Sequence, residues 1–206
     1  MLEPYLQQRS EELAAELAIV FAAEPADDGA DFELARVAAS LAVEHWLASL
    51  ALLSSGLLSA AAVVHRAQYE AVLRSVWIRY SASEVQLEKL AQVVNTQTSQ
   101  AAQSLASSSE MMKAIEHDAP RPLVIALQTF RDNSWKSLNS YAHAGLHAIR
   151  HHDVGYPAYL FEGTAKNSNG LAMLGAMHVA SLTEDEALMK HTHSLQFKYA
   201  NCFAPK

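Results

Sequence analysis

Histidines and basic side chains are concentrated in one stretch of the sequence, WKSLNSYAHAGLHAIRHH, at positions 135–152. Its polar side chains recur every three or four residues: Lys136, Asn139, His143, His147 and Arg150. On one continuous helix this spacing forms a polar stripe beside an apolar one. Histidine can act as a general acid or base near neutral pH, and lysine or arginine can stabilise a phosphate. The stretch therefore predicts phosphate-directed acid–base chemistry, unless the stripe is only the solvent-facing side of a helix.

An earlier stretch, HRAQYEAVLRSVW, carries a second group of charges. Arg66, Glu70 and Arg74 follow one another at intervals of four residues, so Glu70 can bridge both arginines within one helix. They project close to the apolar face marked by Tyr69, and charges at the edge of a core need partners. Two interpretations are open: an ordinary structural Arg–Glu–Arg network, or one wall of a polar cleft that faces His143.

The two stretches together resemble the HEPN-type helical bundles, over roughly residues 42–150. The resemblance is carried by RAQYEAVLRSVW on an early helix and LNSYAHAG on a later one. Ribonucleases of this type carry an arginine followed after four to six residues by a histidine. Two protomers commonly bring these helices together, and the superfamily is rich in toxins and phage-defence proteins. His143 matches the histidine, whereas the arginine position falls on Lys136, seven residues earlier.

The resemblance implies metal-independent cleavage of RNA, with His143 as base or acid. Lys136 and Arg66 would stabilise the phosphate, and Asn139 and Tyr141 would orient the substrate. A lysine cannot make the planar, bidentate phosphate contact of a guanidinium, so Arg66 or Arg74 would supply it from the other helix. We expect one polar cluster of Arg66, Glu70 and His143, with further contributions from Lys136, Asn139, Tyr141, Arg74, Tyr69 and His147.

Two other functions remain open. A bundle of this kind can serve as a non-catalytic module that binds a nucleotide, a small anion or a partner protein. Alternatively, His143, His147 and His151 are spaced for a helical metal site. The third lies about 12 Å along the helix from the first, so a carboxylate such as Glu70 would have to complete the site. We expect no resident metal and no cofactor, because the sequence lacks a complete metal or nucleotide motif.

The overall composition limits the class of protein. The 206 residues include only seven glycines and six prolines, and this scarcity of helix breakers favours an all-α fold. The net charge of −7 argues against an extensive surface for duplex nucleic acid. Cys202 is the single cysteine and is expected to be a free thiol, as suits the cytoplasm. The acidic N-terminus does not resemble a signal peptide.

Helical periodicity and stop signals predict a bundle of about seven to eight helices in one domain, 1–206. A core bundle is expected at about 31–152 and a C-terminal helical hairpin at about 166–203. The uncharged run Trp46–Val64 is interpreted as a buried hairpin rather than a membrane helix, because SSG interrupts it. A fourth helix is expected to continue to about Leu105, one long helix to carry 135–152, and EGTAKNSNG to form a loop.

We further expect a homodimer that does not associate with membranes. The uncharged run offers more apolar surface than a small hairpin readily buries. In the family that the chain resembles, the site usually forms between protomers.

Overall fold

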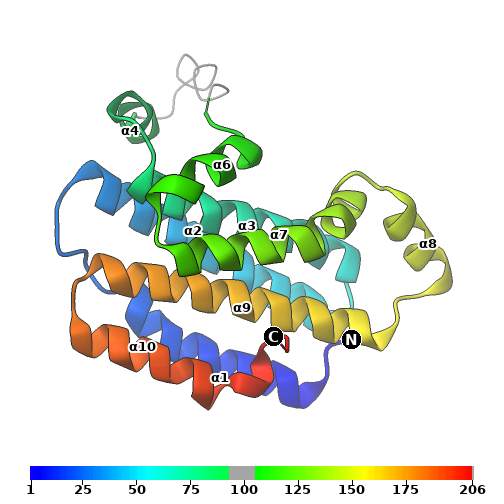
Figure 1. Cartoon of the computed structure of the whole chain (residues 1–206). Helices are drawn as coiled ribbons and strands as arrows, with labels where there is room; N and C mark the ends of the chain where they lie inside the picture. Colours follow the sequence, from blue (N-terminus) through cyan, green and yellow to red (C-terminus); the bar gives the residue numbers. More distant parts are fainter. Residues whose placement is uncertain (93–104, 206) are drawn as a thin grey trace.

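Helices make up most of the described chain, residues 1–92 and 105–205 of a computed structural model (Figure 1). Within these ranges nine α-helices are present and no strand. They are α1 (Pro4–Phe21), α2 (Ala30–Ser54), α3 (Leu58–Tyr80), α4 (Glu84–Ala91), α6 (Ser108–Asp118), α7 (Arg121–Ala142), α8 (Leu146–Val154), α9 (Ala158–Leu182) and α10 (Glu186–Lys198), followed by the 3-10 helix η2 (Ala200–Cys202). The predicted all-α bundle is confirmed. The predicted continuation of the fourth helix to about Leu105 falls mostly on residues outside the described ranges.

The predicted hairpin at Trp46–Val64 is present as the end of α2, a short turn and the start of α3. Gly56 in this turn has a φ of +79°, a conformation that glycine adopts without the steric penalty of a side chain. Among the described residues, α2 is the one helix that is long and apolar enough to cross a membrane by length and composition. A core helix of a bundle meets the same criterion, and here α2 buries Trp46 and Leu53 against its neighbours.

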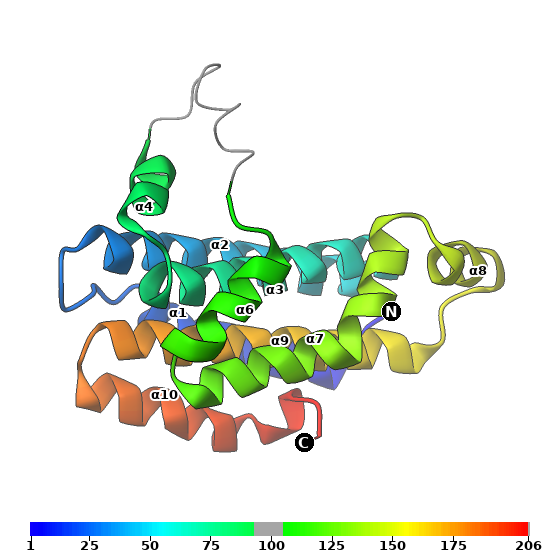
Figure 2. The same ribbon diagram turned by 45° about the horizontal axis from the view of Figure 1, so that its top comes forward.

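The core has two groups of buried apolar side chains, and α9 contributes to both. One group lies mainly between α1, α2, α9 and α10, and the other between α3, α6 and α7. Figures 1 and 2 show α9 running through the middle of the bundle, with α7 on one side and α10 on the other. The region predicted at about 31–152 and the hairpin predicted at about 166–203 therefore share one set of packed helices.

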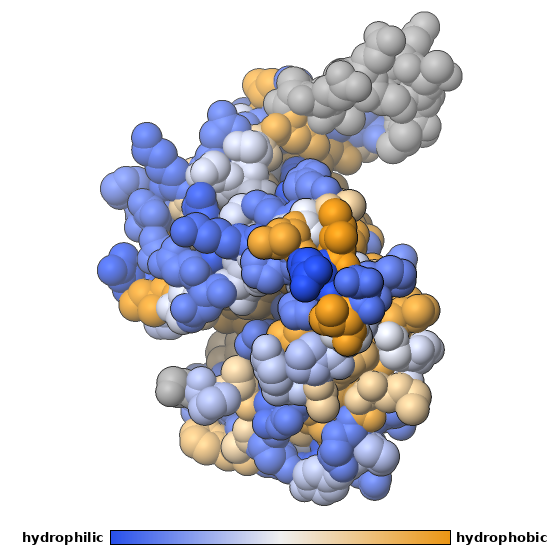
Figure 3. Space-filling model, turned by 90° about the vertical axis from the view of Figure 1, so that its right-hand side faces the viewer, coloured by the Kyte–Doolittle hydropathy of each residue, from blue (hydrophilic) through white to orange (hydrophobic). Residues whose placement is uncertain are grey.

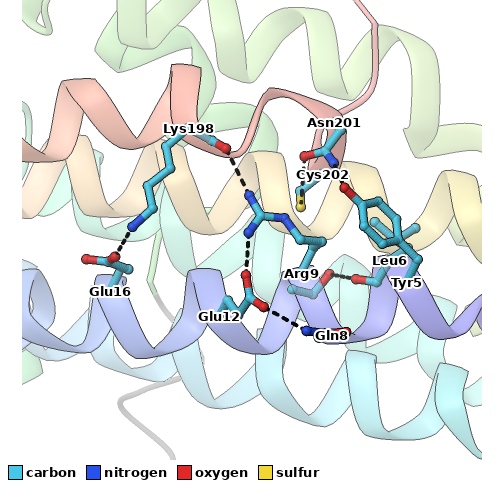
Figure 4. A network of polar contacts seen from close by, with 10 residues as sticks. Tyr5, Leu6, Gln8, Arg9, Glu12, Glu16, Lys198, Asn201 and Cys202 are labelled. Atoms are coloured by element: carbon cyan, nitrogen blue, oxygen red, sulfur yellow. Dashed lines mark hydrogen bonds and ion pairs between the residues drawn. The ribbon is translucent and has the colours of Figure 1, made fainter.

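Polar contacts tie α1 to the C-terminal end of the chain (Figure 4). Arg9 forms an ion pair with Glu12 and donates a hydrogen bond of 2.9 Å to the carbonyl oxygen of Lys198. Lys198 in turn pairs with Glu16. Cys202 is a free, buried thiol, as predicted, and burial raises its pKa. The two ends of the chain are thus held together although they are far apart in sequence.

The loop predicted at EGTAKNSNG is wrong, because these residues lie inside α9. Asparagine, serine and glycine have low helix propensity, yet tertiary contacts override it here. Ser168 and Asn169 are fully buried and hydrogen-bonded to side chains of α1, α2 and α3. The long-range partners that stabilise this part of the helix are not visible in the local sequence.

The single long helix predicted for 135–152 is also wrong: α7 ends at Ala142 and α8 begins at Leu146. The Ala144 N–H bonds to the Tyr141 carbonyl and the Gly145 N–H bonds to the Ser140 carbonyl, which is a Schellman motif. A Cβ at Gly145 would lie only 2.8 Å from Ser140 Oγ, so the close return of the chain requires glycine. The polar stripe predicted on one helix is therefore divided between two.

Ala144 occupies the left-handed position of this motif, with a φ of +50°, although glycine is the residue best suited to it. We expect Ala144→Gly to raise the free energy of unfolding by about 0.5–1 kcal/mol, because the Cβ strain disappears. Urea denaturation followed by circular dichroism measures the change. Ala142→Gly, inside the last turn of α7, is the control and should lower the stability by a similar amount. Equal destabilisation by both variants would contradict the assignment of strain to Ala144.

Candidate functional site

Three arginines lie where α3, α6 and α7 meet, in a group that we call the arginine cluster. It consists of Arg66, Glu70 and Arg74 from α3, Ser108 and Ser109 from α6, and Arg131 and Trp135 from α7. Neither Glu70 nor any of the three arginines is fully buried or fully exposed. Half-buried charges in such a place can contact a ligand from solvent while being only weakly screened.

Of the two pairings predicted for Glu70 within α3, the one with Arg66 is confirmed, whereas Arg74 forms no ion pair with it. Arg66 Nη2 donates to Glu70 Oε1 over 3.2 Å, one helical turn away. The Arg66 guanidinium also lies 4.9 Å from the centre of the Trp135 ring, within the range of a cation–π interaction. Its Nε atom is buried and has no hydrogen-bond partner in the described part of the chain. One Arg66 donor is therefore left unused inside the cluster.

The N-terminus of α6 supplies the opposite wall. Ser107 and Glu110 form a capping box. The hydrogen bonds that the Glu110 carboxylate accepts from the side chain and backbone of Ser107 lower the pKa of Glu110. Ser108 Oγ donates to Glu70 Oε1 over 3.2 Å, and Arg131 donates to Ser109 Oγ over 3.1 Å. The positive end of the α6 dipole thus lies beside the carboxylate that pairs with Arg66.

Arg74 is the least compensated charge of the cluster. It is half-buried, and burial lowers the pKa of its guanidinium, an effect that the nearby Glu70 carboxylate opposes. Glu70 Oε1 is already bonded to Arg66 and to Ser108. Among the described residues Arg74 has neither a hydrogen bond nor an ion pair. A half-buried guanidinium whose nearby carboxylate already bonds to other groups is costly, so this position favours an anion from outside the chain.

Tyr69, predicted as a binding residue, is instead part of the core. Its side chain is fully buried, and its ring stacks on Phe130 at 4.9 Å between centres. Its hydroxyl donates to Met112 Sδ over 3.8 Å, and burial raises its pKa to about 12. Tyr69 lies three residues after Arg66 on α3 and faces α7, so its ring packs against Phe130 and Trp135.

Tyr141 and His147 lie in a second group, at the junction of α7 and α8. Tyr141 Oη and His151 Nδ1 share a hydrogen bond of 2.8 Å, and burial raises the pKa of Tyr141. The centre of the His151 ring lies 6.4 Å from that of His147 and 6.0 Å from that of Tyr156. This group comes from the end of α7 and from α8, whereas the arginine cluster lies beside the middle of α7.

The remaining predicted residues belong to neither group. Lys136 and His143 are exposed, and His143 is the C-cap residue of α7. His143 follows Trp135 by eight residues, or about 12 Å along the helix axis, and within the described chain its imidazole has no hydrogen bond or ion pair. Asn139 is half-buried, and its Oδ1 has no partner among the described residues. The structure therefore joins Arg66 to Glu70 but does not join His143 to them.

The helix break also bears on the metal hypothesis. His143 ends α7, whereas His147 and His151 are on α8, so the three do not continue along one helix. In the described part of the chain, no group of three histidine, cysteine, aspartate or glutamate side chains is placed to hold a metal ion.

Sequence reasoning missed Ser108, Ser109 and Arg131 because each belongs to a different helix from Arg66. The available signal was Arg131 and Trp135 at a spacing of four residues, which puts both on one face of α7. It also missed a second buried polar set, in which Asn169 and Gln68 are the central residues and His65 bonds to Gln68. His178 is buried separately, beside Tyr80.

The fold and the cluster define an all-α helical bundle with a half-buried cationic site. Residues 39–205 match a family of unknown function, DUF6988, and the chain belongs to this family. The matched region contains every residue of the arginine cluster and the whole of α8. No curated protein and no solved structure matches the chain.

Proposed function

We propose that this protein is a binding module for phosphate-bearing ligands, with RNA as its macromolecular ligand and the arginine cluster as its site. The observation that carries this proposal is Arg74, a half-buried guanidinium with no hydrogen bond or ion pair among the described residues. The cluster contains three arginines and one carboxylate, Glu70, and the exposed Asp132 and Glu110 are acidic side chains beside it. Arg74 is the one arginine of the cluster without a hydrogen bond among the described residues.

The groups of the arginine cluster suit a phosphate better than a carboxylate-bearing protein surface. Guanidinium groups bind phosphate oxygens in pairs, and free N–H groups at the start of a helix favour the same anion. Trp135 adds an aromatic ring beside Arg66, so a nucleobase attached to the phosphate could stack nearby. The resemblance to HEPN-type bundles, many of which act on RNA, supports RNA over other phosphate-bearing ligands.

We expect Arg74→Gln to weaken binding of a fluorescently labelled single-stranded RNA by about 10- to 100-fold at low salt. A hydrogen bond to a charged group contributes about 1.5–3 kcal/mol, which corresponds to this range. Fluorescence anisotropy measures the dissociation constant, and the salt dependence should become weaker in the variant. Arg121→Gln removes the same charge from an exposed position at the start of α7 and should change the affinity little. An equal loss of RNA affinity in the two variants would mean that only nonspecific electrostatic attraction binds the RNA. This result would contradict a binding site at Arg74.

Metal-independent RNA cleavage is a second candidate, because Lys136 and His143 are both exposed and are separated by nearly two helical turns. They point to the same side of α7, where a second protomer can approach. The test incubates mixed RNA with the protein in EDTA, beside His143→Ala. A catalytic histidine would make cleavage fall about 10²–10⁴-fold in the variant. RNA binding without cleavage would support the binding module and exclude the ribonuclease. Cleavage that EDTA abolishes would indicate a metal-dependent enzyme instead.

A further inference from the structure

Helix α8 is a short arm whose side chains are almost all in solvent. Leu146, Ile149 and Val154 are 72%, 61% and 67% exposed, and Ala148 is the one buried residue of the helix. Figures 1 and 2 show α8 projecting from one end of the bundle, and Figure 3 shows apolar and strongly hydrophilic side chains gathered on that end. A nine-residue helix is too short to be stable in water by itself, so its exposed apolar residues suit a docking element.

A groove of about 290 Å³ lies between α1 and α2. Five of its nine lining residues are aliphatic, among them Leu2 and Leu47, and the exposed Glu11 is one of the four polar ones. Glu11 accepts a hydrogen bond from Gln7 but has no ion pair in the described part of the chain.

We propose that α8 of a second copy of this chain occupies the α1–α2 groove, and that the contact is reciprocal. A nine-residue helix is about 13 Å long, and the groove runs beside α1 from its start at Pro4 to Ala14, about 15 Å, so the lengths fit. The apolar residues Leu146 and Ile149 meet the aliphatic lining. The charges are also complementary: Glu11 is exposed on the groove, and Arg150 is exposed on α8, where its ion pair with Asp153 is long, at 3.8 Å, and lies in solvent.

The positions of the two surfaces permit a closed dimer. Figures 1 and 2 place the N-terminus at the same end of the bundle as α8, and the groove begins at Leu2. A two-fold axis at that end therefore lets each copy give its α8 and receive its partner's. Because two such contacts form together, each has to bury only about 600–1,000 Å² of the total that specific interfaces need. This inference does not rest on the proposed RNA-binding function.

Sedimentation velocity from about 1 to about 100 μM tests the proposal, because specific dimers of ordinary affinity dissociate in this range. The wild type should dimerise, and Ile149→Glu should raise the dissociation constant at least 30-fold, as expected for a central apolar contact. Val85→Glu changes an equally exposed apolar residue on α4 and should leave it unchanged. Circular dichroism checks that each variant stays folded.

A charge exchange makes the test specific. Glu11→Arg and Arg150→Glu should each weaken the dimer, and the double variant should recover most of the wild-type affinity because the pair is restored with reversed signs. A wild-type monomer at 100 μM would overturn the proposal. So would a dimer that is insensitive to Ile149→Glu, since this would place the interface on another face, or a double variant no better than the singles.

Discussion

Replacing Asn169 by leucine is expected to lower the free energy of unfolding by about 4 kcal/mol, a large effect for one substitution. Asn169 is fully buried, and its Oδ1 accepts a hydrogen bond of 2.9 Å from Trp46 Nε1. Its Nδ2 donates to Ser10 Oγ and to the carbonyl oxygen of Cys202. One amide thereby connects α1, α2, α9 and the C-terminal segment. Leucine has a similar volume but would leave several buried polar groups without partners, each costing about 1–3 kcal/mol.

Urea denaturation followed by far-ultraviolet circular dichroism gives the change in unfolding free energy. Asn167→Leu is the matched control, because Asn167 lies two residues earlier on α9, is half-buried and has no side-chain hydrogen bond among the described residues. It should change stability by less than about 1 kcal/mol. If Asn169→Leu is no worse than Asn167→Leu, the buried polar network does not hold α1 in place.

The second large effect is a loss of stability in mild acid. His65 and His178 are almost completely buried, and burial lowers the pKa of each to about 4 from an ordinary value of 6.5. Between these values the unfolded chain binds protons that the folded chain does not. The stabilising contribution is therefore complete above pH 6.5 and is lost as the pH falls toward 4. At pH 5.0 the linkage relation gives a loss of about 2 kcal/mol for each histidine.

Unfolding free energies at pH 7.5 and pH 5.0 measure this dependence. The wild type should lose about 4 kcal/mol between the two values, and His178→Gln should lose about half as much because glutamine does not titrate. The comparison uses the difference between pH values, so a change in the baseline stability of the variant does not matter. His152→Gln removes an exposed histidine and should keep the wild-type dependence. An unaltered pH dependence in His178→Gln would contradict the burial of a neutral imidazole.

Local sequence predicts the parts of this fold that depend on neighbouring residues. Scarce glycine and proline indicate the all-α class, the SSG sequence indicates the turn at Gly56, and the four-residue spacing indicates the Arg66–Glu70 pair. The break between α7 and α8 was not predicted because alanine, not glycine, occupies the left-handed position. Glycine stands one residue later, where its small size matters instead.

The rest depends on contacts between distant residues. Asn169 lies 123 residues from its partner Trp46, and Gln68 donates to a carbonyl 100 residues away. The local sequence of this part of α9 therefore predicts a loop, because it does not contain the partners that stabilise the helix. Likewise the arginine cluster needs α6 and α7, because Ser108 donates to Glu70 and Arg131 donates to Ser109. Sequence reasoning found the α3 half of the candidate site, but it assigned His143 rather than Arg131 as the contribution of the later helix.

The most direct test of the proposed function follows the indole N–H signals of the three tryptophans by ¹H–¹⁵N NMR during titration with a short single-stranded RNA. Trp46 and Trp77 are buried in the core, whereas Trp135 is half-buried beside Arg66. We expect only the Trp135 signal, assigned with Trp135→Phe, to shift with saturation, and the shift to be lost in Arg74→Gln. Saturable RNA binding that leaves the Trp135 signal unmoved, or no binding at low salt, would contradict a phosphate site at the arginine cluster.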